Sequence, residues 1–180
     1  MTQVSMTELP ELPARSRRLS EILSCARDRI EAEGWEALSM RTLAADLGIR
    51  APSLYKHLSS REELRTHLLI DALVEMGQQC RQAIAADASV AGLLRAYRQA
   101  AAGAPALYRL ATTGPLDRQR LPDGLEEWSG EPFFIVTGDP VRAQALWAAT
   151  HGLTILELDA RLPPGSDIDA AWEALSATWR

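Results

Sequence analysis

Apolar side chains recur every three or four residues along most of the chain, which is the spacing of amphipathic helices. The longer segments with this spacing cover residues 16–33, 60–86, 89–103 and 139–162, and a last one begins at residue 166. Two shorter helices are predicted within residues 39–58 and another near residues 107–110. The apolar run 133–136 has no second segment to pair with as a strand. The pattern therefore predicts an all-α protein of about nine helices.

Two stretches break this periodicity. Proline and glycine recur over residues 115–138, and both disfavour a continuous helix. We expect an ordered loop region there, in which residues 125–128 form at most one or two helical turns and the run 133–136 is a packed loop or the approach to the next helix. Residues 1–14 contain Pro10 and Pro13 and predict a disordered leader.

The segment 39–58 has the layout of a DNA-binding helix-turn-helix. Its first helix has one apolar face, a serine that can cap its start and a glycine that can end it: Met40, Leu43, Ala44 and Leu47, with Ser39 before them and Gly48 after them. Pro52 falls in the first turn of the second helix, where no intrahelical N–H is needed. Because Ala44 is small, the second helix can cross close to it.

The outward side of the second helix is cationic and polar. It carries Arg50, Ala51, Ser53, Tyr55, Lys56 and His57. Arginine can bond guanine edges or phosphates, and lysine and tyrosine suit phosphate oxygens. Arg50 stands at the expected N-cap, where small polar residues are preferred, which favours an external partner for its guanidinium. The alternative is a solvated charged face in an ordinary helical bundle.

Charge is distributed unevenly along the chain, whose net charge is −5. The residues through His67 contain ten basic and ten acidic side chains, and the remainder contains nine and fourteen. Within residues 39–61, Asp46 is the one acidic residue among four basic ones. A local basic face on an acidic molecule limits non-specific binding to phosphate and leaves a reading surface intact.

Several classes of protein lack their sequence signatures here. The chain has no run of 18 apolar residues and no secretory signal pattern, so we expect a cytoplasmic protein. Cys25 and Cys80 lie on apolar helical faces, which predicts free buried thiols. The histidines have no metal-ligand spacing, and neither a phosphate-binding glycine loop nor a nucleophile elbow is present. We expect no enzyme activity, no catalytic residue, no metal and no cofactor.

The first 70 residues resemble the N-terminal domain of TetR-type bacterial transcriptional repressors. The resemblance is carried by Gly34-Trp35, Leu54-Tyr55-Lys56-His57 and Ser60-Arg61-Glu62-Glu63-Leu64. The chain departs from the family at Leu58, where Phe is usual, and at residues 50–52, where Ser-Lys-Gly is commoner and base preference is affected. The resemblance implies a DNA-binding domain over residues 15–62 and a ligand-binding and dimerisation domain over residues 63–180. The expected DNA contacts are Arg41, Thr42, Arg50, Ala51, Pro52, Ser53, Tyr55, Lys56, His57 and Arg61.

The segment 147–153 resembles the Trp-His-Gly-type C-terminal domain of one branch of that family, which implies effector binding and a homodimer. Trp147 and His151 are four residues apart and share a helical face. The imidazole of His151 either bonds a ligand or bonds a neighbouring carbonyl and only packs. The candidate ligand-binding residues are Met76, Tyr97, Tyr108, Trp147 and His151, each of which is alternatively plain core.

Large apolar residues near the end of the chain suggest a dimer interface, because such side chains seldom face water. The candidates are Leu146, Leu153, Leu156, Trp172, Leu175 and Trp179. Two helices from each copy would form an isologous interface, unless these residues only close the subunit's own core. The sequence thus predicts a repressor that a small-molecule effector releases from a palindromic double-stranded DNA operator. A helical enzyme and a protein-interaction adaptor without DNA binding are the alternatives.

Overall fold

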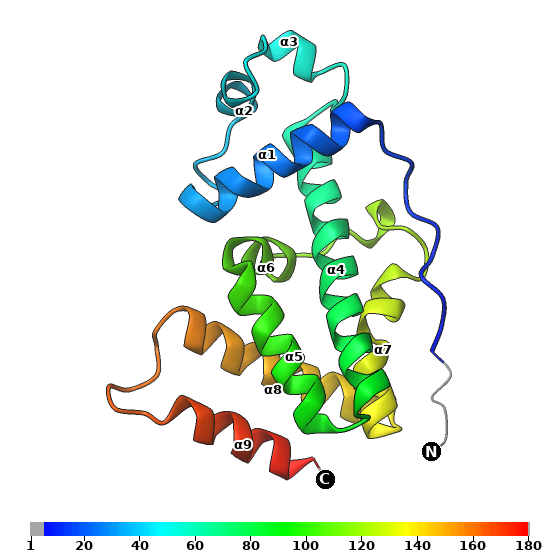
Figure 1. The fold of residues 1–180 in the computed structure, drawn as a ribbon, viewed down its shortest axis with the longest axis vertical. Coiled ribbons are helices and arrows are strands. Elements are labelled where there is room, and N and C mark those ends of the chain that lie inside the picture. The colour runs from blue at the N-terminus through cyan, green and yellow to red at the C-terminus, as the bar shows by residue number, and fades with distance from the viewer. Residues whose placement is uncertain (1–5, 180) are drawn as a thin grey trace. The chain divides into compact units, whose positions relative to one another are not determined.

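The computed structural model describes residues 6–179, and within this range it contains helices and no strands. The helices are α1 (Arg17–Glu33), α2 (Met40–Asp46), α3 (Ala51–Leu54), α4 (Arg61–Ala86), α5 (Val90–Gly103), α6 (Pro105–Thr112), α7 (Leu125–Thr137), α8 (Pro140–Leu158) and α9 (Ile168–Thr178), with a 3-10 turn η1 (Arg118–Arg120) (Figure 1). The all-α prediction is confirmed. In the described range no helix combines the length and the apolar character that a membrane crossing requires.

The chain divides into two compact units. One contains Pro10–Leu73 and Ala104–Leu125, and we call it the α1 unit. The other, called the α8 unit, contains residues up to Leu9, Val74–Gly103 and Glu126 onward. Helix α4 therefore contributes its first half to the α1 unit and its second half to the α8 unit.

The α1 unit is built on a continuous apolar core. Helix α1 packs against α2 and α6, and α2 packs against α3. The core side chains Leu43, Leu54 and Leu64 are fully buried, and Ala44 is 1% exposed. The small side chain of Ala44 thus lies inside the helix-turn-helix, as the sequence predicted.

The α8 unit joins α5, α8 and α9, which contact one another in all three pairs. Arg98 of α5 lies at the centre of a polar cluster between these helices. Its guanidinium is 2.7 Å from the Glu157 carboxylate of α8 and 2.6 Å from that of Asp169 at the start of α9. Trp172 of α9 donates its indole N–H to Glu157 at 2.8 Å. One arginine therefore ties three helices together.

Helix α7 corrects the prediction of a loop over residues 115–138. Pro132 lies inside this helix, where it cannot donate the usual hydrogen bond to the carbonyl of Trp128. That carbonyl instead accepts from the Arg81 guanidinium of α4 at 3.2 Å, so it is not left unpaired. Arg81 also pairs with Glu131 of α7. Helix α7 continues past Pro132 because Arg81 of α4 supplies the missing donor.

Helix α8 ends four residues earlier than the predicted end at residue 162. Ala160 has φ +50°, and the N–H of Ala160 bonds Glu157 O while that of Arg161 bonds Leu156 O. This pair of bonds is the Schellman C-cap, which usually has glycine in the left-handed position. Alanine occupies that position here, so the sequence lacked the usual signal for this helix end.

The leader predicted over residues 1–14 includes residues 1–5, which lie outside the described residues. Its described part forms no helix. Thr7 donates its N–H and its hydroxyl to the Glu131 carboxylate at 3.1 Å and 3.0 Å, and its carbonyl accepts from Arg81. Thr7 is therefore held by α4 and α7 within the α8 unit.

Candidate nucleic-acid interface

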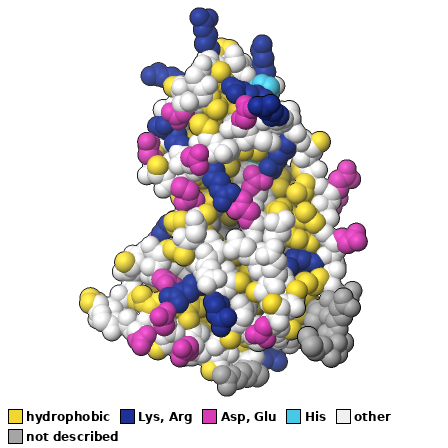
Figure 2. Space-filling view, in the orientation of Figure 1, with side chains coloured by type: hydrophobic (Ala, Val, Ile, Leu, Met, Phe, Trp, Pro, Cys, Tyr) yellow, Lys and Arg dark blue, Asp and Glu magenta, His cyan; other side chains and the backbone are white. Residues whose placement is uncertain are grey.

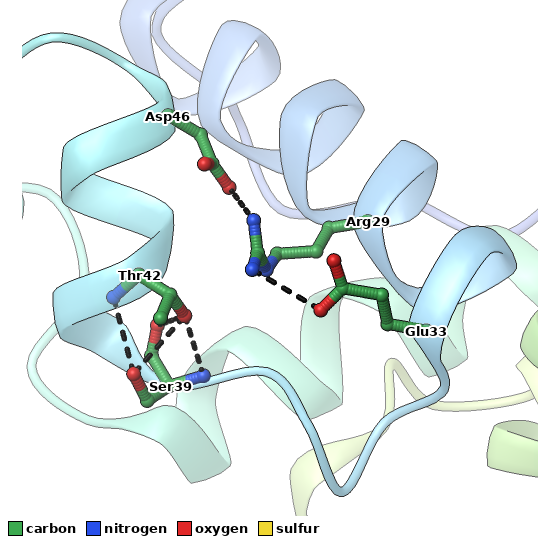
Figure 3. A network of polar contacts seen from close by, with 5 residues as sticks. All are labelled: Arg29, Glu33, Ser39, Thr42 and Asp46. Carbon is green, nitrogen blue, oxygen red and sulfur yellow. Dashed lines mark hydrogen bonds and ion pairs between the residues drawn. The ribbon is translucent and has the colours of Figure 1, made fainter.

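The first helix of the helix-turn-helix begins with a reciprocal cap (Figure 3). The Ser39 hydroxyl accepts the N–H of Thr42 at 3.1 Å, and the Thr42 hydroxyl accepts the N–H of Ser39 at 3.0 Å. Two donors that lack helical partners are satisfied by this exchange. The serine cap predicted from the sequence is confirmed, and it fixes where α2 starts.

The other end of α2 is fixed by an ion pair (Figure 3). Arg29 of α1 lies 2.6 Å from the carboxylate of Asp46, the last residue of α2, and 3.1 Å from that of Glu33. The hydrogen bond to Asp46 raises the pKa of the Arg29 guanidinium above its ordinary value. Asp46 is the one acidic residue in the segment 39–61, and its partner is therefore an arginine outside that segment. Asp46 thus does not pair with Arg41, Arg50 or Lys56.

The turn into α3 follows the predicted geometry. Gly48 has φ +65°, a conformation that glycine adopts without steric cost. Arg50 occupies the N-cap of α3 and makes no side-chain capping bond, and Pro52 lies in the first turn. Regular α-helix covers Ala51–Leu54, and the segment then continues as a turn through His57.

The face expected to contact DNA is open to solvent. Arg41, Arg50, Pro52, Tyr55, Lys56 and His57 are exposed, and Thr42, Ala51, Ser53 and Arg61 are half-buried. Lys and Arg side chains gather over the part of the α1 unit that carries α2 and α3 (Figure 2). Within residues 6–179, Arg41, Arg50 and Lys56 form no ion pair with a carboxylate. Their charge is thus available to an external anion.

Two of the expected DNA-contacting residues have internal partners. The Thr42 hydroxyl is held in the cap, where it also donates to the Ser39 carbonyl at 2.8 Å. The Arg61 guanidinium lies 4.2 Å from the ring centroid of Trp35 and donates to the carbonyls of Trp35 and Leu38 at 2.7 Å and 3.1 Å. Both residues shape the α1 unit, and direct DNA contacts by them stay predictions.

The helix after this face begins with a variation on the predicted capping box. The Ser60 hydroxyl accepts the N–H of Glu63 at 3.0 Å, as expected. The Glu63 carboxylate, however, accepts from the N–H and the hydroxyl of Ser59, one residue earlier, at 2.6 Å each. These bonds lower the pKa of Glu63, which keeps the carboxylate ionised at the positive end of α4.

The residues expected to bind a ligand do not all lie in one unit. Tyr108 belongs to the α1 unit, where it is 5% exposed, whereas the other four belong to the α8 unit. Tyr97 is 3% exposed and packs edge-on against Phe133, with ring centroids 5.7 Å apart. Trp147 is 46% exposed and stacks on His151 at 5.9 Å, and partial burial lowers the pKa of His151. Met76 contacts Cys80, whose sulfur lies 4.0 Å from that of Met76.

The expected dimer residues divide into buried and accessible ones. Leu146 is fully buried and Trp172 is 7% exposed, so their own subunit covers both side chains. This corrects their assignment to a dimer surface, because a partner cannot reach them without rearrangement. Leu153, Leu175 and Trp179 are half-buried, and Leu156 is 39% exposed.

The structure adds two exposed apolar residues that the sequence did not single out. Val141 on α8 is 70% exposed and Phe134 on α7 is 48% exposed. On α8, Val141 shares one face with the exposed small residues Ala145 and Ala148 and with the half-buried Gly152, at spacings of three and four residues. Apart from its chain neighbours and the backbone of its own helix, no described residue comes within 4 Å of a Cβ added at Gly152. A second helix could therefore approach this face closely.

Comparisons with known proteins agree with this geometry. The sequence profile described as "Bacterial regulatory proteins, tetR family" matches residues 22–68. An uncharacterised HTH-type transcriptional regulator of Mycobacterium tuberculosis is 31% identical over 159 residues, which cover 81% of this chain and 72% of that protein.

Solved structures show the same fold over nearly the whole chain. The protein SCO4313, whose crystal structure is known, is 26% identical in sequence, with a TM-score of 0.72 over 93% of this chain and 98% of that one. The TetR family transcriptional regulator PfmR from Thermus thermophilus shares the fold at 19% identity, with a TM-score of 0.59 over 87% of this chain and 97% of that one. The chain belongs to the tetR family of bacterial regulatory proteins and is a DNA-binding transcriptional regulator.

Proposed function

We propose that this regulator is a homodimeric repressor that a small-molecule effector releases from a near-palindromic operator. Two copies would place their α3 segments in successive major grooves, about 34 Å apart. Arg41, Tyr55, Lys56 and His57 would contact phosphates, and Arg50, Ala51 and Ser53 would read base edges.

The observation that carries the proposal is the set of exposed cations around α3. Arg41, Arg50 and Lys56 are exposed and have no carboxylate partner within the described residues. Asp46, the one acidic residue in the segment 39–61, pairs with Arg29 of α1 and not with these cations. An adaptor that had lost DNA binding would have no need to keep such a face unneutralised, so the adaptor alternative is not favoured.

The dimer part of the proposal rests on the outer face of α8. Val141, Ala145, Ala148 and Gly152 offer a surface on which the same helix of a second copy can pack in isologous fashion. Phe134, Trp147 and Leu156 add exposed apolar area to the same unit. Half-buried Leu153, Leu175 and Trp179 stay candidates for the rim of this surface.

We propose that the effector binds in the α8 unit. The Trp147-to-Gly152 segment supports a Trp-His-Gly-type C-terminal domain, and the buried rings of Tyr97 and Phe133 support an apolar binding region there. Effector binding would favour a conformer whose two α3 segments no longer match the operator spacing. An effector that binds in this way is expected to raise the thermal midpoint of the protein and also to lower its affinity for DNA.

Fluorescence anisotropy with duplex DNA from the region upstream of the chain's own gene tests DNA binding. Lys56→Ala should weaken binding to all sequences alike and reduce the slope of log K against log salt by about 1. Arg95→Ala is the matched control, because Arg95 is an exposed cation in the α8 unit. Absence of binding to any duplex at low salt by the folded dimer would refute the proposal.

Sedimentation equilibrium tests the dimer. Ala148→Glu places a charge on the α8 face and should convert the dimer to a monomer, since an unpaired charge is costly to bury. Ala91→Glu makes the same change at an exposed position of α5 and should leave the dimer intact. A wild-type chain that sediments as a monomer at micromolar concentration would contradict this part of the proposal.

A further inference from the structure

Helix α6 lacks a local cap at its start. Its N-cap residue is Ala104, which has no side-chain acceptor. The N–H groups of Ala106 and Leu107 donate instead to the two carboxylate oxygens of Glu31 on α1, at 3.0 Å and 2.8 Å. Because Pro105 has no N–H and Tyr108 bonds Ala104 O, Glu31 satisfies the remaining donors of the first turn.

The other end of α6 has a cationic partner. One guanidinium nitrogen of Arg65 on α4 donates to the carbonyls of Leu110 and Thr113, each at 3.2 Å. A carboxylate thus lies at the positive end of the helix dipole, and a guanidinium lies at its negative end. Both charges complement the partial charge of the helix end that they contact.

The apolar face of α6 completes the core around the helix-turn-helix. Leu107 and Leu110 are 3% and 5% exposed, and they belong to the same cluster as Leu43 of α2 and Leu54 of α3. Helix α6 is therefore part of the α1 unit, although it lies far beyond α3 in the chain. Through the peptide bond between Gly103 and Ala104 it also continues α5 of the α8 unit.

We propose that Glu31 and Arg65 are positioning residues for DNA binding. They fix the two ends of α6 to α1 and α4, which belong to the same unit as α3. Neither residue needs to contact DNA for this role. This inference rests on the proposed function, since it concerns how that DNA-binding face is held in place.

The effect of removing Glu31 on DNA affinity distinguishes the positioning role from a simple effect of charge. Removing a carboxylate from a DNA-binding unit should strengthen binding to a polyanion if only long-range electrostatics matter. The positioning role predicts weaker binding. Glu36→Ala is the matched control, because Glu36 has a 93% exposed side chain in the same unit and, within the described residues, forms no hydrogen bond or ion pair with α6.

The experiment compares amide hydrogen exchange of α6 and operator affinity in the full-length chain. Glu31→Ala should speed exchange at Ala106 and Leu107 about fivefold, the factor that corresponds to losing an N-cap of about 1 kcal/mol. Operator binding should weaken by a comparable factor. Glu36→Ala should change neither the exchange of α6 nor the affinity in this direction.

Two further variants keep the test decisive if Glu31→Ala folds poorly. Glu31→Gln retains one acceptor oxygen and should give intermediate exchange and affinity. Arg65→Gln should speed exchange in the last turn of α6, which ends at Thr112, and it should weaken operator binding in the same direction as Glu31→Ala. Unchanged α6 exchange in both Glu31 variants, or faster exchange with equal or tighter DNA binding, would overturn the inference. A wild-type chain that binds no DNA would instead refute the proposed function.

Discussion

Gly77 on α4 offers a direct test of how the α8 unit is packed. A Cβ built on Gly77 would lie 2.4 Å from Cζ3 and 3.0 Å from Cε3 of the Trp128 ring, and 3.2 Å from the backbone of Ser129. Trp128 is 5% exposed, and Arg81 lies 4.7 Å from its ring centroid on the same helix as Gly77. The ring therefore has little room to withdraw when Gly77→Ala adds a methyl group.

The size of the effect follows from comparison with a second glycine. Gly130 lies inside α7 and is exposed, and no atom of the described residues outside its neighbouring helix backbone lies within 4 Å of an added Cβ. Either substitution gains about 1 kcal/mol of helix propensity. That gain cancels in the difference between the two variants, which leaves the overpacking term of about 1–3 kcal/mol. Gly77→Ala should thus be less stable than Gly130→Ala by about that amount.

Urea unfolding followed by far-UV circular dichroism measures this difference. For a chain of this length, about 2–4 °C of thermal midpoint should accompany each kcal/mol. The comparison requires that both variants keep the wild-type slope of unfolding free energy against urea. If Gly77→Ala equals or exceeds Gly130→Ala in stability, the close contact between α4 and Trp128 is not present in solution.

Four further changes have defined outcomes. Arg61→Ala should lower the free energy of unfolding by about 2 kcal/mol in the absence of DNA, because the Arg61 guanidinium donates to two carbonyls. The free energy of unfolding of the control Arg41→Ala should stay within about 0.5 kcal/mol of the wild-type value. Burial lowers the pKa of His67 below its ordinary value of 6.5, so the unfolded chain binds more protons than the folded one at acidic pH. The free energy of unfolding should therefore fall between pH 7.5 and pH 5.5. In urea titrations, His67→Gln should reduce this dependence of stability on pH. Burial raises the pKa of Cys80 to about 12, so a thiol reagent at pH 8 should modify it only after unfolding, as mass spectrometry can verify. Ala160→Gly should raise the thermal midpoint, because glycine relieves about 1 kcal/mol at φ +50°.

The sequence determined the elements whose signals are local. Ser39, Gly48 and Pro52 lie within a few residues of the helix ends that they define, so their chemistry fixed α2, the turn and the start of α3. The apolar spacing likewise identified α1 and α4, because buried apolar side chains recur in both helices. The face around α3 was found as the set of polar residues left over once the apolar positions were assigned.

Tertiary structure decided the features whose partners lie far along the chain. Helix α7 passes through Pro132 because Arg81, 47 residues before Trp128, bonds the carbonyl that proline leaves free. Helix α6 starts without a local cap because Glu31, 75 residues earlier than Ala106, supplies the acceptor.

Tertiary packing also decided which of the large apolar residues are buried and which are exposed. Periodicity shows that Leu146 and Val141 both lie on α8, but only the packing of α8 shows that Leu146 is buried within the subunit and Val141 faces outward. A sequence pattern reports the chemistry of each position, whereas a hydrogen bond or a buried surface depends on which distant segment is folded against it.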